Sequence, residues 1–200
     1  MYYLSLVGLS AFAISGVLAS KEKRPDIIGG LILAFATALG GGICRDAILG
    51  QPAASFKDIN NFYVILISAF IAMFFLKKIE RHNSKLDFFD AIGLGVFNAS
   101  GFIMGIEFTQ FPAFSAIILG AITGTGGGVT RDILCNRMPY LLRSGEFYIT
   151  PTIIGGLAGL ILFYFGLSTD LIAITISLVT IIIRLLSLKY RWSLPTYYKY

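Results

Sequence analysis

Seven long apolar runs constrain this chain more than any other feature of its sequence. A helix that crosses the hydrocarbon core of a bilayer needs about 20 apolar residues. Of the 200 residues, 56% are hydrophobic and 14% charged, and the mean hydropathy of +0.79 does not suit a soluble surface. The sequence therefore predicts an all-α membrane protein whose loops leave no room for a soluble catalytic or nucleic-acid-binding module. The seven expected helices are residues 2–20, 27–49, 61–79, 88–105, 112–135, 150–166 and 168–188.

Basic residues are distributed unevenly between the two sides that seven spans define. Fourteen of the 16 lysines and arginines fall on one side, and only Arg45 and Lys57 fall on the other. Because cytoplasmic loops carry the basic excess, we expect the N-terminus outside and the C-terminus in the cytoplasm. The first basic residues come after the uncharged run 2–20, whereas a cleaved signal peptide carries its basic residues before the apolar region. The sequence therefore predicts that the first helix is retained. Since the basic residues lie at the ends of apolar runs, they indicate topology rather than a nucleic-acid partner.

One motif occurs twice. Residues 40–46, GGGICRD, recur as residues 126–132, GGGVTRD, with five identities 86 residues apart. Similarity continues one helix earlier, where GL, F and SG in residues 8–16 match residues 93–101. The repeating unit is three helices, and because three is odd the second copy must insert upside down. We expect one transmembrane domain, residues 1–200, made of repeat one (1–84), repeat two (85–167), a seventh helix (168–188) and a cytoplasmic tail (189–200).

The glycine triplets of the motif weaken a helix. Each glycine costs about 1 kcal/mol relative to alanine in a helix interior, and irregular backbone inside a membrane is tolerated only beside protein or a water-filled cavity. We therefore expect the second and fifth helices to kink or unwind at their triplets and to form hinges beside a pathway. The alternative is that glycine simply lets two helices pack closely. The six residues are Gly40, Gly41, Gly42, Gly126, Gly127 and Gly128.

An arginine and an aspartate follow each triplet, Arg45 with Asp46 and Arg131 with Asp132. Charges inside spans are costly and usually face the bundle interior or line an ion pathway, so these pairs are candidates for pore charges at the two mouths. Neighbouring helical residues point in different directions, and each arginine is therefore expected to find its acceptor elsewhere. The alternative is that the charges cap helix ends and set topology.

Neutral polar residues also lie within the expected spans. Their oxygens could line a pore and coordinate a partly dehydrated cation, or they could only form hydrogen bonds between helices. No ring of acidic residues lies near the midplane, which disfavours a calcium-selective filter. The candidate pore-lining residues are Ser15, Thr37, Asn98, Ser100 and Thr123.

Enzyme chemistry has little support in the sequence. His82 is the only histidine and lies in a charged loop, so no metal site or histidine base is expected. No glycine-lysine pair follows either triplet, and no phosphate-cradling loop is expected. Cys44 and Cys135 fall near opposite faces of the membrane and should not bridge each other. We expect neither an enzyme nor a bound cofactor.

Seven expected helices and two GGGxxRD motifs in an inverted repeat resemble the prokaryotic trimeric intracellular cation (TRIC) channels. The resemblance covers nearly the whole chain. It implies a homotrimer in the plasma (inner) membrane, each subunit holding a pore for monovalent cations, chiefly potassium, lined by its first, second, fourth and fifth helices. Membrane lipids are further expected partners, because basic loop clusters attract anionic headgroups.

Bacterial members of the same family have also been described as glycine transporters. Inverted repeats with broken helices are a common plan of secondary transporters, which bind substrate near the midplane and alternate between two states. A small amino-acid transporter working by alternating access is therefore the rival hypothesis. A third possibility is a structural or lipid-binding membrane subunit that carries no flux.

Overall fold

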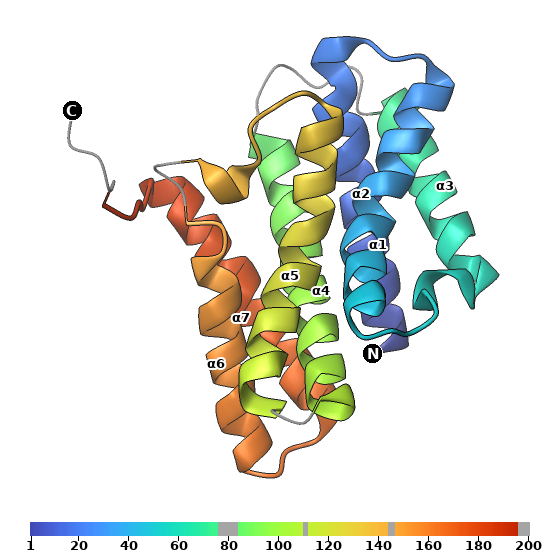
Figure 1. Ribbon diagram of the computed structural model, residues 1–200. Coiled ribbons are helices and arrows are strands. Elements are labelled where there is room, and N and C mark those ends of the chain that lie inside the picture. The colour runs from blue at the N-terminus through green and yellow to red at the C-terminus, as the bar shows by residue number, and fades with distance from the viewer. Residues whose placement is uncertain (76–83, 110–111, 144–146, 196–200) are drawn as a thin grey trace.

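The computed structural model describes residues 1–75, 84–109, 112–143 and 147–195 (Figure 1). Within these residues the chain forms seven α-helices joined by short loops, three of which contain a single 3₁₀ turn. The α-helices are α1 (Tyr2–Ser20), α2 (Ile27–Ile48), α3 (Ile59–Phe75), α4 (Ser84–Phe108), α5 (Pro112–Leu134), α6 (Thr150–Tyr164) and α7 (Thr169–Tyr190). The 3₁₀ turns are η1 (Lys21–Lys23), η2 (Ala54–Phe56) and η4 (Tyr140–Leu142).

The helices have the length and surface of membrane spans. Five of them, α1, α2, α4, α5 and α7, are long and apolar enough to cross a membrane, and α3 and α6 are shorter apolar helices. Their outward side chains are large and apolar, among them Ile28, Ile67 and Phe114, with 67%, 57% and 71% of their surface exposed. A surface of this kind is stable in lipid rather than in water. The chain is an all-helical membrane protein, as its sequence predicts.

Most helix limits agree with the sequence expectation within two residues, and the clearest difference is at α4. This helix begins at Ser84 and ends at Phe108, whereas the sequence predicts residues 88–105. The added first turn carries charged residues, but it also places Leu86 in a buried cluster with Ala19 and Cys135. Burial on one face therefore extends the helix past its apolar run. The predicted end of the third helix, residues 76–79, and His82 lie outside the described residues.

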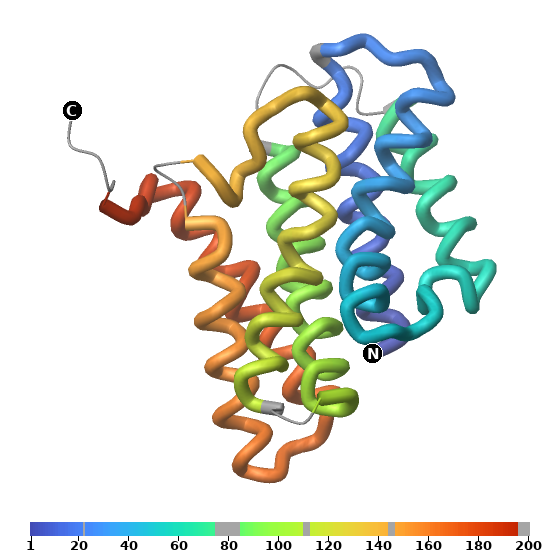
Figure 2. The backbone as a smooth tube through the Cα atoms, viewed as in Figure 1, coloured from blue at the N-terminus to red at the C-terminus, as the bar shows by residue number. Residues whose placement is uncertain are grey.

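The two repeats pack side by side in opposite directions. In Figure 2, α2 runs toward the lower end of the bundle, whereas α5 runs toward the upper end. Phe12 of α1 stacks on Phe97 of α4, its counterpart in the repeat, with ring centroids 5.3 Å apart and planes 6° apart. The loops after α2 and α5 also match, since Gly50 and Asn136 both adopt positive φ, at 64° and 50°. The fold is thus an inverted repeat about a pseudo-two-fold axis between α1 and α4.

The seventh helix completes the bundle beside repeat two. It packs against α4 and α6, and its buried Ile176 joins Phe102 in one apolar cluster. At the start of α7, the carboxylate of Asp170 forms an ion pair with the Met1 ammonium group at 2.9 Å. The start of α1 and the end of α7 lie at opposite ends of the bundle (Figure 1), as an odd number of spans requires.

Fusion reporters test the orientation that the basic residues predict. We expect a fluorescent protein fused after the last residue to fluoresce and alkaline phosphatase at the same position to stay inactive, because only the former matures in the cytoplasm. Alkaline phosphatase inserted after Gly50, between α2 and α3, should be active. The opposite pattern of activities would invert the assigned topology.

Candidate functional site

Both glycine triplets lie inside unbroken helices. Helix α2 continues through Gly41 to Ile48, and α5 continues through Gly127 to Leu134. The expected unwinding is therefore absent, and whether either helix bends there stays a prediction. The triplets instead bring the two backbones together. A Cβ atom added to Gly41 would collide with the carbonyl oxygen of Thr123, and one added to Gly126 would lie 2.9 Å from Gly41 Cα. This is the close-packing role of glycine.

Two buried threonines flank the contact between the triplets. The hydroxyl of Thr37 donates to the Leu33 carbonyl at 2.6 Å, and that of Thr123 donates to the Leu119 carbonyl at 2.5 Å. Both side chains are fully buried, and they occupy matching positions of the two repeats. Each hydroxyl donates its proton within its own helix and keeps its oxygen lone pairs as acceptors.

The lower end of this interface holds a buried pair. Arg45 of α2 is 4% exposed and Asp46 is 1% exposed. The guanidinium of Arg45 donates from Nε to Asp46 Oδ1 at 2.8 Å and from Nη1 to the hydroxyl of Ser100, on α4, at 2.8 Å. The second carboxylate oxygen of Asp46 accepts the backbone amide of Ala54 in η2 at 2.7 Å. One arginine thus joins the two repeats while its aspartate anchors the following loop.

The upper end repeats this arrangement with the partners exchanged. Arg131 of α5 is fully buried and donates from Nε to Asp132 Oδ1 at 2.9 Å. Its Nη1 donates to the hydroxyl of Ser15, on α1, at 2.6 Å. The second oxygen of Asp132 accepts the backbone amide of Tyr140 in η4 at 3.1 Å. The pseudo-symmetry of the chain therefore extends to individual hydrogen bonds.

The acceptors of the arginines differ from the sequence expectation of a carbonyl released by a triplet or the other repeat's aspartate. Each arginine does reach the other repeat, but its partner there is a serine, Ser100 or Ser15. Each also binds the aspartate next to it in sequence, which the sequence interpretation did not expect. The long arginine side chain can fold back along its own helix, so the directions of neighbouring Cβ atoms do not decide the contact.

The upper end carries an additional acid. Asp90 of α4, fully buried, accepts Arg131 Nη1 at 2.6 Å and the hydroxyl of Tyr148 at 3.3 Å. Gly128 of the second triplet makes room for this hydroxyl, which any Cβ at that position would meet. Asp90 Oδ2 and Arg131 Nη2 have no hydrogen-bond partner among the described residues. At the matching positions, repeat one has Ser5 and an exposed Tyr63, so the lower end lacks this acid.

Arginine side chains pack against tyrosine rings at the upper end. Arg143 lies over the Tyr140 ring at 4.3 Å, and Arg184 of α7 lies over the Tyr148 ring at 4.9 Å. Arg184 is fully buried and donates to a backbone carbonyl at 2.8 Å. The hydroxyl of Tyr140 donates to Asp87 at 2.9 Å. Burial, and then the neighbouring Asp87 carboxylate, raise the pKa of Tyr140 well above its ordinary value, so the phenol stays protonated.

Sequence reasoning missed three residues of this upper network, namely Asp90, Tyr148 and Arg184. Asp90 and Arg184 both lie inside expected spans, and a charge within a span is itself a signal of function. Arg184 is one of the 14 basic residues on the side predicted to be cytoplasmic, and this topology explanation masks the signal. Tyr148 carried a weaker signal, because it matches Tyr63 in the repeat.

Asn98 occupies a different part of the bundle from the arginines. Its amide donates to the Thr152 carbonyl of α6 at 3.0 Å and to the Thr180 hydroxyl of α7 at 2.9 Å. These bonds join α4 to α6 and α7, away from the contact between α2 and α5. The geometry favours the structural alternative for Asn98, and a pore-lining role stays a prediction.

The acidic residues and the two cysteines that the structure describes are not gathered into one cluster. Among the described residues, no cluster of three histidine, cysteine, aspartate or glutamate side chains could hold a metal ion. Cys44, which is exposed on α2, and Cys135, which is buried after α5, are both free.

Buried charges at both ends of an inverted repeat are typical of one class of membrane protein, the channels and secondary transporters. The family model described as "Glycine transporter" matches residues 2–77 and 87–164. A UPF0126 membrane protein of Vibrio cholerae is 38% identical, and the match covers 98% of this chain and 82% of the Vibrio cholerae protein. The UPF0126 inner membrane protein YadS of Escherichia coli is 34% identical, and the match covers 98% of this chain and 96% of YadS.

Solved structures of the same architecture are TRIC channels. A structure described as "Structural basis for conductance through TRIC cation channels" is 33% identical with a TM-score of 0.88, covering 100% of this chain and 98% of that one. The TRIC trimeric intracellular cation channel orthologue from Rhodobacter sphaeroides is 29% identical with a TM-score of 0.87, covering 94% and 97%. The chain belongs to the prokaryotic TRIC family, to which the glycine transporter description is also attached.

Alanine substitutions at two adjacent glycines test whether the close contact between α2 and α5 requires glycine. Alanine at Gly41 should destabilise the fold, because its Cβ would meet the Thr123 backbone. A Cβ atom at Gly42 would contact only Ser55 Oγ, at an ordinary distance of 3.5 Å. Gly42→Ala should therefore stabilise α2 by about 0.5–1 kcal/mol, because alanine favours a helix more than glycine does. Thermal unfolding in detergent measures both effects. If Gly42→Ala lowered the melting temperature as strongly as Gly41→Ala, the contact between Gly41 and Thr123 would not explain the need for glycine in α2.

The two arginines should differ in their effect on stability. Removing one partner of a buried ion pair costs about 3–5 kcal/mol. Arg131→Gln removes an ion-pair partner from both Asp90 and Asp132, whereas Arg45→Gln removes one only from Asp46, so the melting temperature should fall further for Arg131→Gln. Adding Asp90→Asn to Arg131→Gln should restore part of the loss. Equal losses for the two arginines, with no restoration, would contradict the assigned network.

Proposed function

We propose that this chain is a channel for monovalent cations, permeable to potassium, with one pore in each subunit. The observation that carries the proposal is the pair of buried charged networks at the two ends of the interface among α1, α2, α4 and α5. Burying a charge in a membrane-spanning region is costly, and such residues usually mark an ion or substrate path. The TRIC structures that share this fold are described as cation channels, which supports the same activity here.

The composition of the networks suits weak binding of monovalent cations. Arg45 with Asp46 has no net charge, and at the other end Arg131 and Arg184 balance Asp90 and Asp132. Neutral clusters do not hold a divalent ion tightly, and conduction requires sites that an ion can leave. Between the networks, the acceptor oxygens of Thr37 and Thr123 supply ligands, and within the upper network Asp90 Oδ2, which has no hydrogen-bond partner among the described residues, supplies another.

The structure corresponds to a closed state in this proposal. Phe12 stacks on Phe97 at the axis, and the triplets of α2 and α5 leave no side-chain space between them. Opening requires these helices to separate. Bending at Gly40–Gly42 and Gly126–Gly128 is the proposed motion, because glycine adopts altered backbone angles more easily than other residues.

A homotrimer in the inner membrane, with the C-terminus in the cytoplasm, completes the proposal. The R. sphaeroides relative is described as trimeric, and YadS as an inner membrane protein. An open apolar groove of about 600 Å³ runs along α2, lined by Ile32, Phe35 and Leu39 and by Thr130 of α5. An apolar surface of this extent is available for contact with a second copy.

A glycine transporter is the second candidate, and the family description favours it. An inverted repeat with charges on two facing helices can bind a zwitterion, its carboxylate near an arginine and its ammonium near an aspartate. Transport of this kind is saturable and alternates between two states that each open to one side of the membrane, whereas a channel passes discrete current steps.

Planar-bilayer recording of the purified protein in asymmetric potassium chloride tests the proposal. We expect discrete steps that reverse near the potassium equilibrium potential. Arg45→Gln should change the unitary conductance, whereas Lys57→Gln, the same charge change at an exposed position on the same side, should not. Electrical silence together with saturable glycine counterflow in liposomes would replace the channel with the transporter.

A further inference from the structure

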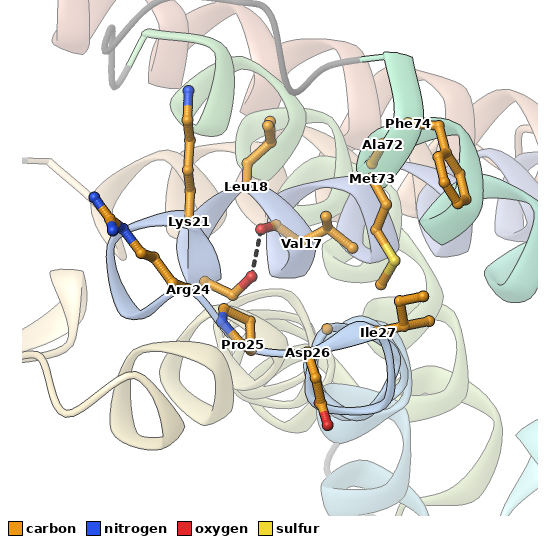
Figure 3. A pocket seen from close by; sticks show the side chains of 12 residues that line it. Val17, Leu18, Lys21, Arg24, Pro25, Asp26, Ile27, Ala72, Met73 and Phe74 are labelled. Carbon is orange, nitrogen blue, oxygen red and sulfur yellow. Dashed lines mark hydrogen bonds between the residues drawn. The ribbon is translucent and has the colours of Figure 1, made fainter.

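A cavity of about 330 Å³ lies between α1, α2 and α3, at the end of the bundle predicted to be cytoplasmic (Figure 3). Its volume is in the range of about 300–1,000 Å³ typical of small-molecule sites. It is separate from the charged networks of α2 and α5. The apolar residues that line it are Val17, Leu18, Ile27, Ala72, Met73 and Phe74.

The polar groups at this cavity already have partners. The hydroxyl of Ser20 donates to the Val17 carbonyl at 2.7 Å, and the Asp26 carboxylate accepts the Gly29 amide at 2.7 Å as the N-cap of α2. A polar ligand inside the cavity would therefore lose its hydration without gaining hydrogen bonds from these groups. The interior suits a hydrocarbon chain.

The rim of the cavity carries two cations. Lys21 belongs to η1, and Arg24 follows it with a left-handed backbone, φ 47°, which turns the chain into Pro25. Figure 3 shows both side chains extending from the same side of the cavity, whereas Asp26 points away from them. Both cations line the cavity, so an anionic group at this rim would lie close to positive charge.

The side of the cavity opposite the two cations is also open. Figure 3 shows Lys21 and Arg24 on one side of the cavity and Ile27 and Phe74 on the other. Ile27 and Phe74, which line the cavity on α2 and α3, expose 56% and 60% of their surface. An acyl chain whose headgroup lies at the cations can therefore pass through the cavity and continue between these two apolar side chains into the bilayer. The equivalent segment of repeat two, from Gly105 to Pro112, contains Glu107 and no basic residue. The combination of cavity and cations is therefore specific to one end of the bundle.

We propose that this cavity binds an anionic phospholipid, with one acyl chain among the apolar residues and the phosphate between Lys21 and Arg24. Each basic residue near a membrane surface adds to the attraction for anionic headgroups. The lipid would fix the α1–α2 connection against α3. Binding at this position does not depend on whether the chain conducts ions.

Native mass spectrometry of the purified protein, titrated with phosphatidylglycerol or phosphatidylcholine of equal chain length, tests the charge recognition. We expect phosphatidylglycerol to bind more tightly, and the double variant Lys21→Gln/Arg24→Gln to weaken its binding about 10- to 30-fold. Lys57→Gln, remote from the cavity, should leave binding unchanged. Equal affinity for both lipids, or no effect of the double variant, would overturn the proposal.

Filling the cavity tests the acyl-chain position. A Cβ atom at Gly30 would lie 2.5 Å from Met73 Cε, the flexible end of that side chain, so Gly30→Leu should fill the space with modest rearrangement. We expect it to weaken phosphatidylglycerol binding at least fivefold while leaving the melting temperature within a few degrees. Gly30→Ala, which narrows the cavity less, provides the same comparison if the leucine variant does not fold. Unchanged binding in the folded variant would refute the assigned cavity.

Discussion

The contact between the backbones of α2 and α5 is the constraint on which the rest of the structure depends. Because Gly41 lies against Thr123 and Gly126 against Gly41, the helices approach more closely than any side chain would allow. This approach places Arg45 and Arg131 at the two ends of one interface, where each reaches a serine of the other repeat. Without it, both guanidinium groups would face lipid or an unfilled gap, at a large cost in free energy.

The sequence predicts the fold well because its apolar runs and its repeated motif both depend directly on the fold. Apolar runs define the spans, and an identical motif 86 residues apart identifies the inverted repeat and the pairs that begin at Arg45 and Arg131. Burial is harder to predict than position. The sequence indicates that a glycine triplet is flexible, but only the structure shows that Thr123 occupies the space beside Gly41.

Other residues are hard to interpret when one explanation is already sufficient. A basic residue near the end of a span satisfies the topology rule, so Arg184 gave no reason to look for a buried network. The polarity of Asn98 suggests a pore, while its partners on α6 and α7 favour the structural alternative. Asp90 has no acidic counterpart in repeat one, so the repeat comparison could not identify it.

The unequal ends of the bundle have a mechanical consequence. At the upper end, Asp90, Tyr148 and Arg184 link α4, α5 and α7 around Arg131, whereas the lower end relies on Arg45, Asp46 and one serine. Links that cross several helices resist displacement more than a single pair does. These additional links all lie within repeat two and α7, which they join into one stiffer unit, whereas each end of the bundle has a single arginine–serine bond between the two repeats. Any relative motion of the halves is therefore expected to leave repeat two with α7 intact and to displace repeat one against it.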